Sequence, residues 1–364
     1  MKPTFLVTGA TSGLGLELVK KLADRQPGSR IILGVRNVDE ARRQVEALDA
    51  ALPGLDVTSR VHVGPSLDLG DFDSVRAFAR AINDSPDPLH VLVNNAGMNK
   101  NSTQRKDAKW PEIISVNYLG PFLLTLLLEP KLLRHADSAD LKSRVVNVSS
   151  IMSRFSTLAE GVSRLEAGSN NTVIDAFMRP EGHQQGVDEV VSTSRLYSDT
   201  KLGNALFTEW LNNRWKDRSQ SGNLRAMSVD PGGVVTGIWR NSRWENSKLL
   251  GMFFAPAADG AEALYDCCID PLSEPATPAN FYARGAFKSP LLQNKPESKR
   301  LAVAAGLVAA FDWPIRNLSG GRLASTTGAV VANLACYDPD VVSRLGDATE
   351  EFLSEFLSES ELIS

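Results

Sequence analysis

The sequence contains little cysteine and little histidine, with three and four residues among 364. Cys267 and Cys268 are adjacent and Cys336 stands apart, so the three cannot form a disulfide framework. We expect buried thiols in a protein of a reducing compartment. The histidines, at positions 62, 90, 135 and 183, show no metal-ligand spacing, so no metal site is expected.

The sequence also has no large excess of positive or negative residues. Lys and Arg total 39 against 43 Asp and Glu, a formal net charge of -4, and no run of basic residues occurs. This balance argues against a nucleic-acid-binding protein.

Long hydrophobic runs are also missing. The longest apolar run, Leu301–Phe311, is shorter than the roughly 20 residues of a membrane-spanning helix. The chain reaches the strand-like Thr4–Val7 almost at once, which leaves no room for a signal peptide. We therefore expect a cytoplasmic protein without a transmembrane segment, for which peripheral membrane contact stays open.

The sequence does contain the composition and the periodicity of an α/β protein. Apolar residues make up 43% and charged residues 23%, as in ordinary globular proteins. Short β-branched runs alternate with stretches of helical spacing, which predicts a doubly wound Rossmann fold with a mostly parallel sheet and helices on both faces. Seven strands are predicted, at Thr4–Val7, Arg30–Val35, Arg60–Val63, His90–Val93, Arg144–Val148, Arg225–Val229 and Asn280–Ala283. The predicted helices are Leu14–Asp24, Asp39–Ala50, Phe72–Ile82, Pro111–Leu133, Leu196–Trp215 and Asp259–Cys267.

Two segments depart from this alternation, and neither looks like a separate domain. Residues 151–195 are rich in Gly, Ser, Asn and Glu and predict an insertion on the surface. Residues 288–337 form an extension to which we assign no mechanism. We expect one domain over residues 1–364, with its core at 2–287.

The tail, residues 338–357, predicts a closing helix. Its acidic polar face is expected to be solvated. One apolar stripe is expected to pack on the core, formed by Val341, Leu345, Ala348, Phe352 and Phe356.

A glycine-rich turn follows the first predicted strand and reads Thr8-Gly9-Ala10-Thr11-Ser12-Gly13-Leu14-Gly15. Glycines here let the backbone approach a pyrophosphate at the N-terminus of the next helix. The spacing differs from the G-x-G-x-x-G fingerprint, and any tight turn favours glycine. The turn alone is therefore a weak indication of a dinucleotide site.

The end of the second predicted strand bears on the choice of dinucleotide. An NAD-specific fold places Asp or Glu there, to accept hydrogen bonds from the adenosine ribose. This chain has Arg36 instead, whose guanidinium matches a 2′-phosphate in charge and geometry. We expect NADP as the cofactor; the plain alternative is an exposed arginine that opens a helix.

Tyr197 and Lys201 lie four residues apart, on one face of a predicted helix. A phenol has a pKa near 10 and needs help to act as an acid near pH 7, and a neighbouring cation lowers that pKa. Such a pair also occurs on ordinary helix surfaces. Ser149-Ser150, at the end of a predicted strand, makes a catalytic interpretation much stronger.

Together these motifs resemble the short-chain dehydrogenase/reductase superfamily over roughly Lys2 to Phe287. Segments 115–125 and 201–207 look like the retinol dehydrogenase and WW-domain oxidoreductase branch, and 145–153 looks equally like carbonyl reductase. The shared motifs are Thr8-Gly9-x-x-x-Gly13-x-Gly15, Asp68-Leu69, Asn94-Asn95-Ala96-Gly97, Asn117, Ser150, Tyr197-x-x-x-Lys201 and Pro231-Gly232.

The resemblance implies a role for each matched residue. Tyr197 would exchange a proton with the substrate oxygen, and Ser150 would hydrogen-bond that oxygen. Lys201 would bind the nicotinamide ribose and lower the pKa of Tyr197, and Asn117 would hold a water that links Lys201 to solvent. No metal is needed, because the proton donor and the hydroxyl already polarise a carbonyl.

The resemblance also implies a set of cofactor contacts. Asp68 and Leu69 would contact adenine, Asn95 to Gly97 would line the adenosine side, and Pro231 to Thr236 would surround the nicotinamide. The cofactor-binding residues expected are Gly9, Thr11, Ser12, Gly13, Leu14, Gly15, Arg36, Asp68, Leu69, Asn95, Ala96, Gly97, Tyr197, Lys201, Pro231, Gly232, Val234 and Thr236.

The long segment between Ser150 and Tyr197 is shared with carbonyl reductase, where it covers the face that other members use to dimerise. We therefore expect a monomer or a weak homodimer. Large apolar residues at Ile238-Trp239-Arg240, Trp244 and Leu249–Phe254 suggest a lipophilic substrate, although they could equally be core.

The leading hypothesis is an NADPH-dependent reductase of a ketone or aldehyde, with the reverse alcohol oxidation open in vitro. One alternative is reduction of a conjugated C=C bond, since protochlorophyllide reductase resembles this branch; its cysteine-rich substrate region is missing here. Another is a non-catalytic NADP-binding interaction protein, against which the intact proton-transfer residues argue.

Overall fold

The computed structural model describes most of the chain, apart from residues 284–337 and several shorter stretches. It describes residues 2–99, 110–136, 142–150, 152–153, 156–163, 165, 172–178, 189–216, 218, 224–232, 234–235, 255–269, 281–283 and 338–357. The predicted extension at 288–337, Thr236 and the whole apolar segment 238–254 lie outside these residues.

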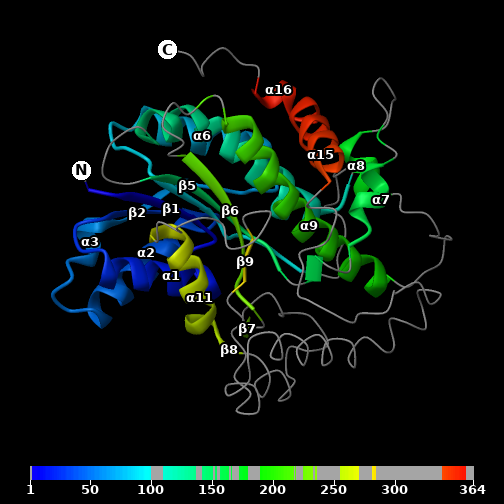
Figure 1. Ribbon diagram of the computed structural model, residues 1–364. Helices are drawn as coiled ribbons and strands as arrows, with labels where there is room; N and C mark the ends of the chain where they lie inside the picture. Colours follow the sequence, from blue (N-terminus) through cyan, green and yellow to red (C-terminus); the bar gives the residue numbers. More distant parts are fainter. Residues whose placement is uncertain are drawn as a thin grey trace.

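A seven-stranded parallel sheet forms the centre of the fold, in the order β3-β2-β1-β4-β5-β6-β9 (Figure 1). The order reverses between β1 and β4, and open α/β sheets bind their ligands outside the carboxyl ends of the strands at such a point. The predicted fold class is confirmed, and strand bounds differ from the prediction by only a few residues. The strands are β1 (Thr4–Thr8), β2 (Arg30–Val35), β3 (Val61–Ser66), β4 (Val91–Asn94), β5 (Ser143–Val148), β6 (Leu224–Asp230) and β9 (Phe281–Ala283).

Helices cover both faces of the sheet because the strands are apolar on both sides (Figure 1). One apolar cluster joins the sheet to α1 (Gly13–Arg25), α2 (Val38–Ala51) and α11 (Ala257–Ile269). It includes Cys267 and Cys268, which are buried free thiols, as predicted. The other cluster joins the sheet to α4 (Phe72–Asp84), α6 (Gly120–Ala136) and α9 (Glu189–Trp215).

The predicted helix Pro111–Leu133 contains a change of winding. Its parts are α5 (Glu112–Ile114), a π-helical turn η1 (Ser115–Leu119) and α6. Within the described residues, Glu112–Arg134 is long and apolar enough to cross a membrane, contrary to the expectation that no run reaches that length. Since 89% of its most apolar window is buried inside the protein, we interpret it as a core helix.

The insertion before Tyr197 is not confined to the surface, which corrects the prediction for 151–195. It contains α7 (Leu158–Val162) and α8 (Val173–Met178). Leu158 and Phe177 are fully buried in the same cluster as α4, α6 and α9. Helices of five and six residues are too short to show a periodicity in the sequence.

The predicted closing helix is confirmed as α15 (Pro339–Phe352), followed by α16 (Ser354–Leu357). The Asp338 carboxylate caps α15 by accepting a hydrogen bond from the Asp340 amide. The predicted apolar stripe packs on the core, with Leu345 fully buried and Phe352 partly buried.

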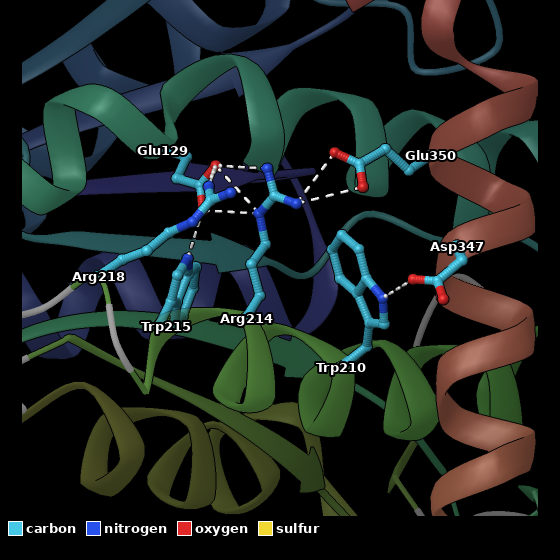
Figure 2. Close-up of polar contacts among 7 residues, drawn as sticks. All are labelled: Glu129, Trp210, Arg214, Trp215, Arg218, Asp347 and Glu350. Carbon is cyan, nitrogen blue, oxygen red and sulfur yellow. Dashed lines mark hydrogen bonds and ion pairs between the residues drawn. The ribbon is translucent and has the colours of Figure 1, made fainter.

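Most acidic residues of α15 are exposed to solvent, as expected, but two of its carboxylates also contact the rest of the fold (Figure 2). Asp347 accepts a hydrogen bond from the Trp210 indole at 2.9 Å, and Glu350 pairs with Arg214 at 3.0 Å. Arg214 also donates at 3.0 Å to Glu129, a buried carboxylate of α6. Because each buried acceptor has a donor, these contacts tie α15 to α9 and α6.

Candidate active site

The glycine-rich turn between β1 and α1 has the backbone that a phosphate group requires. Gly9 and Gly13 have φ values of 65° and 56°, which other residues rarely adopt. A Cβ on Gly15 would lie 2.4 Å from the Gly9 carbonyl oxygen, so the helix can approach the turn only without a side chain there. Ser12 caps α1 without a side-chain hydrogen bond, and the first turn of α1 has no acidic residue. The partial positive charge of this helix end therefore remains available to an anion.

Asn95 holds this turn in place. Its amide donates to the backbone oxygens of Thr8 and Gly9 at 2.8 and 3.3 Å. The backbone amides of Asn95 and Ala96 both donate to the Thr8 hydroxyl at 3.0 Å. The end of β4 is thus tied to the end of β1, and Asn95 acts on the turn itself.

The outer part of the expected dinucleotide site lies at the ends of β2 and β3. The Arg36 side chain is exposed, and the backbone carbonyl oxygen of Arg36 accepts a hydrogen bond from the Ser66 hydroxyl at 2.9 Å. Asp68 accepts from the Gly70 amide at 2.9 Å. The Leu69 side chain is buried in the core.

Tyr197 and Ser150 come together from α9 and the end of β5. The Ser150 hydroxyl accepts from the Met152 amide at 3.2 Å. Ser150 also lies close enough to the Tyr197 phenol to lower its pKa. The structure thus brings these two predicted residues side by side.

Lys201 lies one turn further along α9. Its ammonium donates to the Val148 carbonyl at 2.8 Å and sits 5.6 Å from the centroid of the Tyr197 ring. Burial lowers the pKa of Lys201 to about 8, partly offset by Asp230. A Cβ on Gly97 would lie 3.6 Å from the ammonium, which places Gly97 directly beside Lys201.

The expected lowering of the Tyr197 pKa by Lys201 is not what the structure shows. Burial raises the pKa of Tyr197 and the Asp230 carboxylate raises it further, while Ser150 lowers it. The Lys201 ammonium lies over the ring and is engaged by Val148 rather than by the phenol oxygen. Burial and Asp230 therefore favour the protonated form of Tyr197, the form in which a phenol can act as an acid.

Asn117 is on the π-helical turn η1, where its side chain ties two segments together. Its Oδ1 accepts from the Met98 amide at 2.8 Å, and its Nδ2 donates to the Met98 carbonyl at 3.0 Å. The same Nδ2 donates to the Thr200 hydroxyl at 3.2 Å, next to Lys201. Single π turns are frequent at functional sites.

The Pro-Gly motif after β6 reaches the glycine-rich turn. A Cβ on Gly260 of α11 would lie 2.6 Å from Val234, 2.9 Å from Leu14 and 3.2 Å from the Pro231 oxygen. These three residues therefore converge on one helix. Gly232, with φ 83°, donates its amide to the Asp230 carboxylate at 3.0 Å.

Two carboxylates near the site were not among the predicted residues. Asp230 is buried and acts electrostatically on both Tyr197 and Lys201. Asp199 pairs with Arg195 at 3.2 Å and accepts from the Thr157 amide at 2.9 Å, which holds the insertion against α9. The sequence signal for both is an acidic residue inside or directly before a matched motif.

Comparisons with known proteins agree with this geometry. The family described as short chain dehydrogenase matches residues 3–161. The chain is 32% identical to retinol dehydrogenase 11 of Homo sapiens over 72% of each protein. It is 29% identical to the short-chain dehydrogenase/reductase prx1 of Penicillium rubens over 71% of this chain and 66% of that protein. A variant of actinorhodin polyketide ketoreductase solved with NADPH shares the fold, with a TM-score of 0.54, 21% identity, and coverage of 78% of this chain and 96% of that chain.

The fold and the Ser–Tyr–Lys set define a class of oxidoreductases built on a dinucleotide-binding sheet. The chain belongs to the short-chain dehydrogenase/reductase family, in its retinol dehydrogenase-like branch. The resemblance recognised in the sequence is thereby confirmed.

Proposed function

We propose that the protein is an NADPH-dependent reductase that converts a lipophilic ketone or aldehyde into an alcohol. The observation that carries this proposal is the placement of the Tyr197 phenol beside Ser150 and one helical turn from Lys201, whose ammonium lies 5.6 Å from the centroid of the Tyr197 ring. A bound nicotinamide dinucleotide supplies the hydride to the carbonyl carbon. The uncapped N-terminus of α1 and the glycine backbone around it would hold the pyrophosphate.

In this proposal Tyr197 gives its proton to the carbonyl oxygen as the oxygen gains charge. The Ser150 hydroxyl, which lies beside the phenol, donates a hydrogen bond to the same oxygen. The Lys201 ammonium binds ribose hydroxyls on the side of Gly97. Asn117 holds a water that returns a proton from solvent through Lys201 to Tyr197.

The remaining features of the proposal concern the setting of the enzyme. The apolar segment 238–254 supplies the lipophilic substrate surface, and Thr236 joins Pro231, Gly232 and Val234 around the nicotinamide. We propose a cytoplasmic protein that is a monomer or a weak homodimer, in line with an insertion and a closing helix that both pack on α9.

The test of this function is a panel of lipophilic ketones and aldehydes with NADPH, followed by absorbance and product analysis. We expect alcohols as products. A saturated C=C bond with an intact carbonyl would replace the proposal by conjugated-bond reduction. A cofactor complex inert towards every carbonyl and alcohol would replace it by an NADP-binding interaction protein.

Arg36 is expected to set the preference for NADPH. Its exposed guanidinium at the end of β2 suits a 2′-phosphate, and a charge-assisted hydrogen bond contributes about 1.5–3 kcal/mol. We expect Arg36→Asp to reduce kcat/KM for NADPH by about tenfold or more and to favour NADH, because a carboxylate accepts from ribose hydroxyls. Steady-state kinetics with both cofactors measures the change.

The matched control is Arg134→Asp, which changes an exposed arginine near the end of α6. Because α6 runs away from the carboxyl edge of the sheet, this control leaves the ratio of the two cofactors unchanged. An unaltered ratio in Arg36→Asp would remove Arg36 from the site.

A further inference from the structure

The closing helix α15 makes a buried hydrogen bond to the residue that follows Asn117. The Tyr118 hydroxyl and the Thr349 hydroxyl are 2.9 Å apart, and both side chains are fully buried. Thr349 donates its single hydroxyl proton to the Leu345 carbonyl at 2.6 Å. Tyr118 is therefore the donor in the bond to Thr349.

Tyr118 also touches the helix that carries Tyr197 and Lys201. A Cβ on Gly203 would lie 2.9 Å from the Tyr118 ring, so the ring rests directly on the backbone of α9, two residues beyond Lys201. On another side the ring is 5.2 Å from the ring of Phe177 in α8. Tyr118 thus contacts the closing helix, the insertion and α9 at once.

Because Tyr118 and Asn117 share the π-helical turn, the contacts of Tyr118 bear on the position of Asn117. Ser115–Leu119 is wound with a wider turn than the helices on either side of it. Within that turn the Asn117 side chain must reach both Met98 and Thr200. A fixed neighbour on the same turn limits how far Asn117 can rotate or shift.

We propose that Tyr118, held by Thr349 of α15, is a positioning residue that fixes Asn117 against Met98 and Thr200. The kinetic part of the proposal rests on the proposed reductase function, whereas the position of Asn117 does not. Through this bond the C-terminal helix, more than 200 residues away in sequence, takes part in ordering the proton-relay side of the site.

The variants Tyr118→Phe, Thr349→Val and their double mutant test the proposal. Each removes the bond while keeping the shape of the side chains. We expect kcat to fall about tenfold in all three, because a small misplacement of a catalytic group slows the reaction strongly. KM for NADPH should stay within about twofold, since the dinucleotide contacts are not altered.

A merely structural role predicts a different pattern. Thr349→Val leaves the Tyr118 hydroxyl buried and unpaired, so its thermal stability falls most, and the double mutant recovers stability because neither polar group remains. If kcat recovers together with stability in the double mutant, the positioning role is overturned. Asp347→Ala is the matched control: it removes the Trp210 contact of α15, and kcat should stay unchanged.

A second measurement separates this proposal from the proposed function. The Met98 amide donates to Asn117, so its hydrogen exchange reports on Asn117 without any turnover. We expect exchange at Met98 to quicken at least tenfold in Tyr118→Phe and to stay unchanged in Asp347→Ala. Unchanged exchange in Tyr118→Phe would overturn the positioning role even if the wild-type protein reduces carbonyls.

Discussion

Replacing Tyr197 by Phe is expected to lower kcat/KM for carbonyl reduction by about a thousandfold, within the range of 10²–10⁴ that general acids contribute. The substitution removes one oxygen and leaves the ring that packs on the core. The proton that Tyr197 holds in this structure is the one that the carbonyl oxygen needs. NADPH affinity, measured by fluorescence titration, should change little.

Tyr265→Phe is the control for this prediction. Tyr265 lies on α11, accepts a hydrogen bond from Gln26 and sits under Arg25, on the other face of the sheet from Tyr197. This variant also removes a single tyrosine hydroxyl, and we expect it to keep full activity. Full activity in Tyr197→Phe, with NADPH still bound, would show that another group is the acid.

Much of the fold could be predicted because its signals are local. The strand Arg30–Val35 is predicted to the residue, since Ile31, Ile32 and Leu33 form a run that is buried on both sides. The Tyr197–Lys201 pair is a spacing on a single helix, and Ser150 is fixed by the end of β5. Motifs of this kind place a site without knowledge of tertiary contacts.

The rest depends on contacts between segments far apart in sequence. The contacts of Asp347 and Glu350 on α15 escape the sequence because their partners, Trp210 and Arg214, lie more than a hundred residues earlier. The raised pKa of Tyr197 also escapes the sequence, because it reflects burial and Asp230 rather than the spacing to Lys201. Burial and distant partners are tertiary properties that no local pattern contains.

Lys201→Met is expected to abolish most of the activity and, at pH 7, to make the protein more stable. Lys201 binds ribose in the proposed site, so kcat/KM should fall by at least about a hundredfold. The pKa of about 8 means that the fold holds the ammonium at a penalty of about 3 kcal/mol relative to a pKa of 10.5. Lys201→Met removes this penalty, but it also removes the hydrogen bond to Val148, which costs about 1 kcal/mol of stability. A net increase of about 1–2 kcal/mol in the free energy of unfolding is expected.

The pH dependence of this gain identifies its cause. Between pH 8 and 10.5 the unfolded wild-type chain binds more protons at Lys201 than the native chain, so its contribution to stability rises with pH. The advantage of Lys201→Met is therefore full below pH 8 and should be largely lost by about pH 10.5, above which Lys201 becomes neutral in both states. Lys131→Met, which removes another buried lysine of lowered pKa, on α6, is the control and should keep its activity. A stability gain in Lys201→Met that persists unchanged at pH 10.5 would show that burial of the ammonium is not its source.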